Sequence, residues 1–296
     1  MSKPPLILIG GPTAAGKSAL ALEIATRENG TIINADAMQV YSGLPLLTAQ
    51  PEKQDKAKAP HELYEVFDAA EHSSVGRWLA LAKVVIQRTV DAGRTPILIG
   101  GTGLYFKALS EGLADIPPIP DAVRMEAKEL YACLGPDKFR EALAKLDPES
   151  AKKLKPNDRQ RLMRAYEVAT HTGKPIGNWQ NGNKSTIIGK LFLVKHYLLM
   201  PPREQLYERC DGRFEQMIEC GAIDEVKSLL TRQLDPDLPA MKILGVREIA
   251  AYLRGEMSRD EAVKKAQQAT RNYAKRQMTW FRNQWKNKEL DSSGFL

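Results

Sequence analysis

The sequence has little cysteine, little histidine and no long apolar run. Its three cysteines, Cys133, Cys210 and Cys220, are an odd number without C-x-x-C spacing, and there are only four histidines. This composition argues against a disulfide framework and against a structural zinc site. No apolar stretch approaches the roughly 20 residues that a membrane-spanning helix needs, and the N-terminal one has the length of a buried strand. We therefore expect a cytoplasmic protein without a signal peptide or a membrane segment.

Acidic residues are missing from one stretch near the C-terminus. Residues 264–288 contain eight Lys or Arg residues and no Asp or Glu, with four aromatic residues among them, and the whole chain has a formal net charge of +7. One interpretation is an amphipathic helix whose aromatic side chains pack on the core while its charges face solvent. The other is a surface for the phosphate backbone of RNA or DNA.

What the sequence does contain is a phosphate-binding motif at its start. Residues 5–10 form an apolar run typical of a buried parallel strand, and good helix formers follow Ser18. Backbone N–H groups of such a loop, together with the helix N-terminus, surround phosphate oxygens. The sequence therefore predicts a site for a di- or triphosphate, with Lys17 on the outer phosphate and Ser18 on Mg²⁺. The residues that fit G-x-x-x-x-G-K-[ST] are Gly11, Pro12, Thr13, Ala14, Ala15, Gly16, Lys17 and Ser18.

Two further strand ends are predicted to lie beside this loop. Residues 31–34 lead to Asp36, and residues 95–99 lead to a second glycine-rich turn that ends in Thr102. The carboxyl ends of strands in a doubly wound sheet face one crevice, so both side chains are expected there. Asp36 would bind Mg²⁺ through water or act as a base for an acceptor; an ordinary turn residue is the alternative. The second turn carries no acidic residue, which argues against a motor ATPase or a switch GTPase.

The pattern as a whole predicts an α/β fold, a P-loop NTPase-like core in which helices flank a parallel sheet, with an all-helical insertion domain. Residues 1–112 and 190–296 would form the core with its C-terminal helices, and residues 113–189 a lid. Within the insertion, the expected helices cover residues 121–134, 137–146, 148–154 and 157–172, followed by a polar exit segment at 174–187. After it we expect a strand at 190–200 and helices at 203–220, 248–254 and 258–285.

Arg209 and Arg213 lie four residues apart, on one face of the expected helix at 203–220. Such a pair can reach a phosphate from the side opposite the P-loop. It can equally form surface ion pairs with Glu208 or Asp211.

These motifs and several others together resemble one family. The segments that carry the resemblance are Gly11–Ser18, Asp36–Tyr41, Leu98–Thr102, Tyr105–Ala108, Asn157–Arg164, Arg209–Arg213, Lys242–Arg247 and Lys275–Trp280. Their order and spacing over nearly the whole chain are similar to those of the bacterial tRNA dimethylallyltransferases, or tRNA isopentenyltransferases. The combination of D-x-x-Q-V-Y with K-R-Q-x-T-W is far more specific than the P-loop alone. One position departs: the family usually has Ser where this chain has Ala37, so one hydroxyl that could contact substrate or backbone is missing.

The resemblance implies that the P-loop holds the pyrophosphate of dimethylallyl diphosphate rather than a nucleoside triphosphate. The acceptor would be N6 of the adenine 3′-adjacent to the anticodon, tRNA position 37, in tRNAs that read codons beginning with U. Asp36 would accept the proton of this weakly nucleophilic amine. Thr102 and Arg213, the other implied catalytic residues, would stabilise the departing pyrophosphate together with Lys17 and the Mg²⁺ cofactor on Ser18. The target base would have to leave its stack.

The resemblance also implies a set of residues that contact the anticodon stem-loop. They are Asp36, Ala37, Met38, Gln39, Thr102, Lys107, Arg124, Gln160, Arg161, Leu162, Met163, Arg164, Lys242, Gly245, Arg247, Lys275, Arg276, Gln277, Thr279, Trp280 and Arg282.

Three other functions fit parts of the pattern. In a P-loop small-molecule kinase, Asp36 would activate a hydroxyl and the insertion would serve as a lid. An isopentenyltransferase for free adenylate would need no basic aromatic helix at residues 264–288. An RNA-binding module with a purely structural P-loop would need neither Asp36 nor the arginine pair. A monomer is expected, and the sequence leaves open which tRNAs are modified, which donors are accepted and whether nucleotides compete at the loop.

Overall fold

The computed structural model describes residues 3–180 and 188–285. The chain forms two compact units: a core unit, Met1–Ser110 with Ile187–Leu296, and a helical unit, Glu111–Thr186. The predicted divisions at residues 112/113 and 189/190 differ from these boundaries by two and three residues. Within the described ranges, no helix combines the length and the apolar character needed to cross a membrane.

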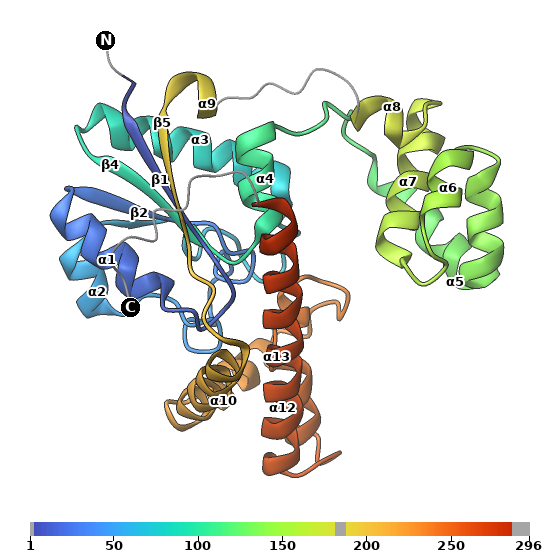
Figure 1. Cartoon of the computed structure of the whole chain (residues 1–296). Helices are drawn as coiled ribbons and strands as arrows, with labels where there is room; N and C mark the ends of the chain where they lie inside the picture. Colours follow the sequence, from blue (N-terminus) through green and yellow to red (C-terminus); the bar gives the residue numbers. More distant parts are fainter. Residues whose placement is uncertain (1–2, 181–187, 286–296) are drawn as a thin grey trace. The chain divides into compact units, whose positions relative to one another are not determined.

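A parallel five-stranded sheet organises the core unit, in the order β3-β2-β4-β1-β5 (Figure 1). After their first residues, β1 and β4 are buried throughout, and β2 is buried along its whole length. Burial on both faces explains why these strands appear in the sequence as continuous apolar runs. The predicted parallel α/β fold is therefore confirmed. The strands are β1 (Pro5–Gly10), β2 (Gly30–Asn34), β3 (His61–Glu62), β4 (Thr95–Gly100) and β5 (Leu193–Leu198).

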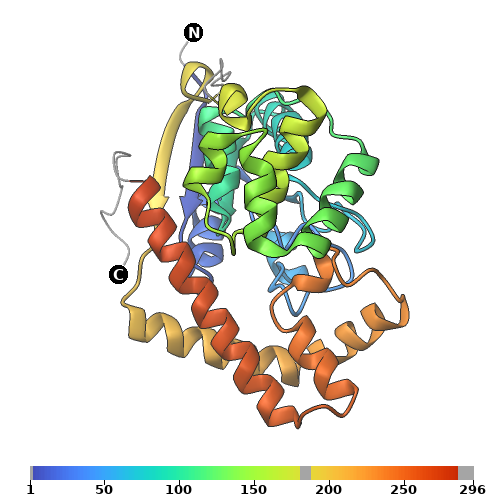
Figure 2. The same ribbon diagram turned by 90° about the vertical axis from the view of Figure 1, so that its right-hand side faces the viewer.

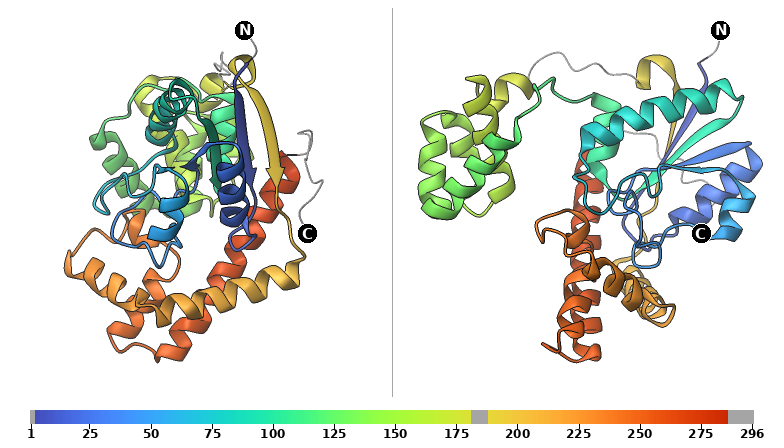
Figure 3. Two further views of the ribbon diagram at one scale, coloured as in Figure 1. Left: turned by 90° about the vertical axis from the view of Figure 1, so that its left-hand side faces the viewer. Right: turned by 180° about the vertical axis from the view of Figure 1, so that it is seen from behind.

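Helices cover both faces of this sheet (Figures 1 and 3). On one face α1 (Lys17–Arg27) packs Ile24 against Ile7 and Ile97 of the strands. α3 (Val75–Asp91) packs against β2 and β4, and its fully buried Trp78 donates its indole N–H to Asn34 O at 2.9 Å. The short α2 (Lys53–Lys58) lies before β3, and α4 (Gly103–Glu111) directly follows the turn after β4.

The C-terminal part of the core unit is helical. α10 and α12 both pack on the long α13, which runs past them in Figure 2. A capping box of Ser258 and Glu261 starts α13. Two features differ from the sequence prediction: Ile188–Leu191 is a short helix, α9, so the strand begins only at Leu193, and residues 222–231 form a helix that was not predicted. The helices are α9, α10 (Arg203–Glu219), α11 (Ala222–Thr231), the 3₁₀ turn η1 (Ala240–Lys242), α12 (Val246–Leu253) and α13 (Arg259–Gln284).

The helical unit has its own apolar core, in which Phe139, Leu143 and Leu162 are completely buried. α5 (Asp121–Ala144) is continuous apart from a break at Gly135, whose φ of 74° and ψ of 174° are not helical. The break separates the two helices predicted there. α6 (Pro148–Lys153) and α7 (Arg159–Thr172) follow as expected. The predicted polar exit segment instead begins with a short helix, α8 (Ile176–Gln180), and its last part lies outside the described residues.

Candidate active site

The P-loop joins β1 to α1. Gly16 is the N-cap of α1 with φ 91° and ψ 9°, a left-handed conformation that residues with a Cβ rarely adopt. Lys17 is the first residue of the helix, and its ammonium group folds back to donate to Pro12 O at 2.6 Å. The hydrogen bond from Lys17 to Pro12 O thus closes the P-loop on itself, and the loop lies at the N-terminus of α1, the positive end of the helix dipole.

Burial lowers the pKa of Lys17 to about 8. The carboxylate of Asp36 opposes this shift by favouring the charged amine, whereas the guanidinium of Arg213 adds to it. The pKa of Arg213 is itself lowered, chiefly by burial. Two cationic groups thus lie close together at this site, and an anion placed between them would relieve their repulsion.

A cavity of about 350 Å³ lies over the loop. P-loop residues, Asp36, Arg209 and Arg213 all line it, and its volume is in the usual range for a small-molecule site. The Arg213 guanidinium donates to Thr13 Oγ1, which connects α10 to the P-loop. Asp211 pairs with Arg271 of α13. Of the two predicted roles for the arginine pair, the geometry favours the one beside the phosphate-binding loop.

Asp36 lies just beyond β2 and is both a turn residue and a cavity residue. Its Oδ1 accepts the N–H of Met38 at 2.9 Å, and its own N–H donates to Asn34 Oδ1 at 2.8 Å. The carboxylate also lines the cavity opposite Lys17. Burial first, and then the negative charge of Asp36, raises the pKa of three phenols, those of Tyr64, Tyr105 and Tyr273. The carboxylate thus lies among neutral phenols and two cations.

The residues after Asp36 are held by side chains from two directions. Thr102 Oγ1 accepts the N–H of Ala37 at 2.9 Å, so the hydroxyl supports the backbone beside Asp36. Gln39 donates both hydrogens of its amide, to Thr48 O at 2.9 Å and to Ala49 O at 2.8 Å. Thr48 and Ala49 form part of the cavity wall. The resemblance assigns Thr102 and Gln39 to catalysis or tRNA contact, and in the structure their side chains support the backbone around the cavity.

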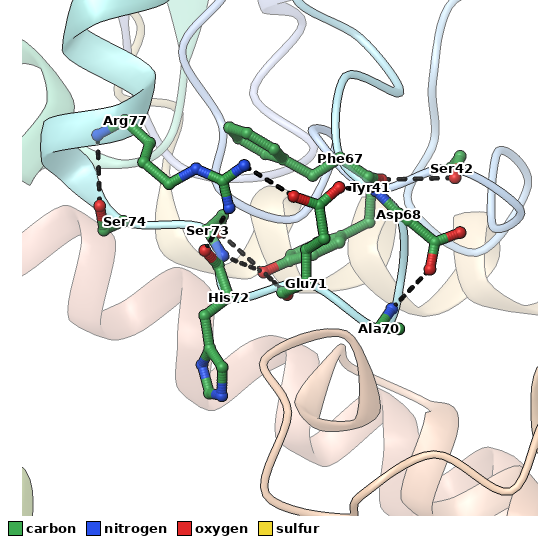
Figure 4. Close-up of polar contacts among 10 residues, drawn as sticks. All are labelled: Tyr41, Ser42, Phe67, Asp68, Ala70, Glu71, His72, Ser73, Ser74 and Arg77. Atoms are coloured by element: carbon green, nitrogen blue, oxygen red, sulfur yellow. Dashed lines mark hydrogen bonds and ion pairs between the residues drawn. The ribbon is translucent and has the colours of Figure 1, made fainter. Parts of the chain in front are cut away.

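Tyr41 fixes the far end of the same segment (Figure 4). Its phenol donates to Ser73 Oγ at 2.7 Å and accepts the N–H of Ser73 at 3.0 Å. Arg77 lies over the ring of Phe67, 4.4 Å from its centroid, and pairs with Glu71 at 2.6 Å. These contacts tie the segment that carries Asp36 to the start of α3.

Several cavity residues were not predicted from the sequence. Leu47 lies in a loop without a recognisable motif, and Phe214, Met217 and Leu244 are apolar residues of ordinary appearance. Only for Tyr273 among these residues does the sequence give a reason to expect a place in the site, since it lies one helical turn before Gln277 in the basic aromatic stretch.

The structure agrees with the amphipathic-helix interpretation of that stretch, and contact with RNA stays a prediction. The aromatic rings of Phe281 and Trp285 are buried on the core, whereas Lys275, Arg276 and Arg282 are exposed. Residues 286–288 lie outside the described part of the chain. α13 therefore presents a basic face and packs an aromatic one.

The other residues assigned to tRNA contact lie in varied surroundings. In the helical unit Leu162 is fully buried, Met163 packs on the core, and Gln160 is exposed. The arginines of that unit form short-range ion pairs: Arg124 with Asp121, Arg161 with Asp158 and Arg164 with Glu167. In the core unit, Lys107 donates to Gln284 and Lys242 pairs with Asp237. Gly245 is the N-cap of α12, and Arg247 is exposed. On α13, the exposed Thr279 donates to Lys275 O, and Trp280 packs edge-on against Phe281.

The strand β1, the loop at Gly11–Ser18 and the helix α1 place this chain in the class of P-loop proteins, with the Asp36 carboxylate beside the loop. The profile of the IPP transferase family matches residues 39–284, and the chain belongs to that family. It is 53% identical over 279 residues to a tRNA dimethylallyltransferase of Caulobacter sp. (strain K31), covering 94% of this chain and 90% of the relative. It is 52% identical over 281 residues to that of Rhodospirillum centenum, covering 95% and 89%.

Solved structures similar to this chain are also tRNA isopentenyl- or dimethylallyltransferases. The full-length tRNA isopentenylpyrophosphate transferase of Bacillus halodurans is 34% identical, with a TM-score of 0.66 and coverage of 95% of this chain and 88% of that one. A eukaryotic dimethylallyltransferase, described in snapshots of its action on tRNA, is 28% identical with a TM-score of 0.80, covering 94% and 70%. The family resemblance predicted from the motifs is confirmed, and the chain is a transferase of the tRNA-modifying class.

Proposed function

We propose that this protein transfers the dimethylallyl group of dimethylallyl diphosphate to N6 of the adenine at tRNA position 37. The product would be N6-isopentenyladenosine, next to the anticodon of tRNAs that read codons beginning with U. The observation that carries this proposal is one cavity of about 350 Å³ lined both by the P-loop and by Asp36. The names of the relatives in the IPP transferase family support it.

The donor's diphosphate would bind at the P-loop. As the bond between the prenyl carbon and the diphosphate oxygen breaks, negative charge grows on the leaving group. Lys17 and Arg213 are cationic groups that line this space, and the start of α1 adds the positive end of a helix. Stabilisation of that charge is the part of catalysis that such preorganised groups supply.

The acceptor amine would approach from the side of Asp36. An exocyclic adenine amine is a weak nucleophile, and the new carbon–nitrogen bond forms while one N6 proton is lost. Asp36 is the carboxylate that lines the cavity beside the loop, so we propose that it accepts this proton. Its Oδ1 is oriented by the N–H of Met38, and Thr102 holds the adjacent backbone.

The residues at this site suit a magnesium ion. The hydroxyl of Ser18 and the carboxylate of Asp36 line one cavity, and Mg²⁺ prefers oxygen ligands completed by substrate phosphates and water. When bound, the ion would neutralise part of the diphosphate's charge. Ser18 would hold it directly and Asp36 through water.

The exposed basic face of α13 supports tRNA as the acceptor, because such a face binds the phosphate backbone of a stem. We propose that the helical unit contributes Gln160, Arg161 and Arg164 to the same RNA. The target adenine must leave its stack to reach the cavity. The protein would work as a monomer in the cytoplasm.

The test is a mass spectrum of nucleosides from unmodified tRNA incubated with the protein, Mg²⁺ and dimethylallyl diphosphate. An adenosine heavier by one prenyl group, absent without the donor, is the expected result. Free AMP and labelled ATP are the matched alternative substrates. Prenylated AMP without prenylated tRNA would identify an adenylate isopentenyltransferase, and phosphoryl transfer to a small molecule would identify a kinase; either result contradicts the proposal.

A further inference from the structure

A single side chain of α13, that of Gln277, connects the P-loop to the turn after β4. Its Oε1 accepts the N–H of Thr13 at 2.8 Å, and its Nε2 donates to Gly101 O at 3.0 Å. Only 5% of the residue is exposed. The resemblance assigns Gln277 to tRNA contact, but in the structure the amide faces the inside of the core unit.

α13 approaches the turn after β4 closely around this contact. A Cβ added to Gly101 would lie 2.1 Å from Gln277 Nε2, and one added to Gly103 would lie 2.2 Å from the Trp280 ring. Glycine at these two positions is therefore what lets the helix come so near. Because the backbone and the helix touch directly, a shift of α13 would be passed on to the P-loop through Gln277.

Thr13 is held from a second side as well. Arg213 of α10 donates to its hydroxyl, while Gln277 of α13 accepts its main-chain N–H. The second variable position of the P-loop, Thr13, is thus held by two helices before any ligand binds. A loop that is already in its binding conformation loses less entropy when a diphosphate arrives.

We propose that Gln277 is a positioning residue for the donor: it holds the P-loop in the shape that receives the diphosphate and couples α13 to that site. The inference rests on the proposed function, since it takes the ligand of the loop to be a diphosphate. The basic face of α13 is where tRNA is proposed to bind, so the same helix would connect the acceptor site with the donor site.

The chemistry of the contact requires an amide. One atom must accept from Thr13 and another must donate to Gly101, and among side chains of this length only glutamine does both. Methionine fills the same space and does neither, which leaves the partly buried N–H of Thr13 and the buried C=O of Gly101 without their partner. An ionised glutamate keeps the acceptor, loses the donor and adds negative charge next to the diphosphate site.

The experiment compares Gln277→Met and Gln277→Glu with the unchanged protein. Pyrophosphate binding is measured by calorimetry, tRNA binding without donor by fluorescence anisotropy, and thermal stability alongside. Gln268→Met is the control, because Gln268 is exposed on the same helix, where it contacts Asn272. For Gln277→Met we expect the pyrophosphate Kd and the KM for dimethylallyl diphosphate to rise about tenfold, as for the loss of one buried polar pairing, with tRNA affinity changed less than about twofold.

The glutamate variant adds a signature that a purely structural role would not produce. Its carboxyl group regains a donor when it is protonated, so its pyrophosphate affinity relative to the unchanged protein should recover as the pH falls from 8 towards 5. Three results would overturn the inference: unchanged pyrophosphate affinity in Gln277→Met, loss of tRNA binding alone, or an equal loss of both affinities together with the fold. If the unchanged protein binds no pyrophosphate, the proposed function itself fails and the inference fails with it.

Discussion

Among single residues, Lys17 has surroundings that favour the binding of an anion. Its amine is buried against Pro12 O, and burial lowers its pKa to about 8, well below the ordinary value of 10.5. Below pH 8 the folded protein therefore holds a buried charge at a cost, and this cost disappears as the pH rises from 8 towards 10.5. A bound diphosphate would reverse the shift by favouring the ammonium form.

This predicts proton uptake on binding. At pH 7 Lys17 is already charged, so pyrophosphate should bind without protonating it. At pH 9 the amine is mostly neutral in the free protein, so binding should be accompanied by the uptake of nearly one proton at Lys17. The affinity for pyrophosphate should therefore fall by up to about tenfold per pH unit above 8. Calorimetry in buffers of different ionisation enthalpy measures this uptake. Lys17→Arg, which stays charged, gives the background from pyrophosphate itself. Equal uptake in the two proteins at pH 9 would contradict the prediction.

Thr102 offers a second residue-scale prediction. The resemblance makes it catalytic, and the structure gives its hydroxyl to the N–H of Ala37, next to Asp36. Thr102→Val removes this acceptor without changing shape, so kcat should fall about tenfold, while Thr102→Ser should retain most of it. Steady-state transfer rates at saturating donor and tRNA check this. Equal loss in both variants would show that the methyl group matters and the hydrogen bond does not.

The P-loop, Asp36 and the arginine pair could be predicted from the sequence because each belongs to a short motif with a known strand or helix beside it. The roles of Thr102 and Gln277 could not. Thr102 acts on a residue 65 positions away, and Gln277 acts on one 264 positions away. Such pairings depend on how the strands and helices pack, which periodicity within one segment does not encode.

At the scale of elements, α11 is one of the helices that were not predicted from the sequence, and it supports the cavity wall. Its Glu225 accepts the N–H groups of Leu46 and Leu47 at 2.8 and 2.9 Å, in the loop that also supplies Thr48 and Ala49. The sequence did carry signals for this helix: Ala222, Val226 and Leu229 are apolar at helical spacing, and two acidic residues lie in the first turn.

Glu225→Ala should therefore loosen this loop. The exposed N–H of Leu46 can bond to water instead, but the partly buried N–H of Leu47 loses its acceptor, which costs about 1–3 kcal/mol of unfolding free energy. Glu225→Gln keeps one acceptor oxygen and should lose less. Denaturant unfolding gives the stability, and the KM for the donor reports on the cavity wall. Normal values of both in Glu225→Ala would show that the loop holds its shape unaided.

At the scale of the whole molecule, alternation of apolar runs with amphipathic segments was enough to predict a parallel sheet flanked by helices. The strand order was not predicted. β1 lies between β4 and β5, and its partners in β5 are nearly 190 residues away, with Pro5 opposite Leu193. The start of β5 is set by its pairing with β1, which the local sequence does not show. The strand was therefore predicted to begin at residue 190, three residues before its actual start at Leu193.

The net charge of +7 and the exposed basic face of α13 predict strongly salt-dependent tRNA binding. Raising KCl from 50 to 200 mM should weaken binding steeply, with a slope of about −0.7 to −0.9 in log K against log salt for each phosphate contacted. Lys275→Ala and Arg276→Ala should each reduce that slope by about one contact, whereas Lys83→Ala, exposed on α3, should not. Filter binding over this salt range measures it, and identical slopes in all variants would exclude this face.

The central claim is that Asp36 takes the proton of the acceptor amine beside the P-loop. The most direct measurement is the rate of prenylation at the adenine 3′ of the anticodon, by mass spectrometry of tRNA fragments, in the unchanged protein and in Asp36→Asn. Asparagine keeps the shape and cannot act as a base, so transfer should slow by about 10²- to 10⁴-fold while tRNA and pyrophosphate still bind. Transfer at the unchanged rate in Asp36→Asn would contradict the account.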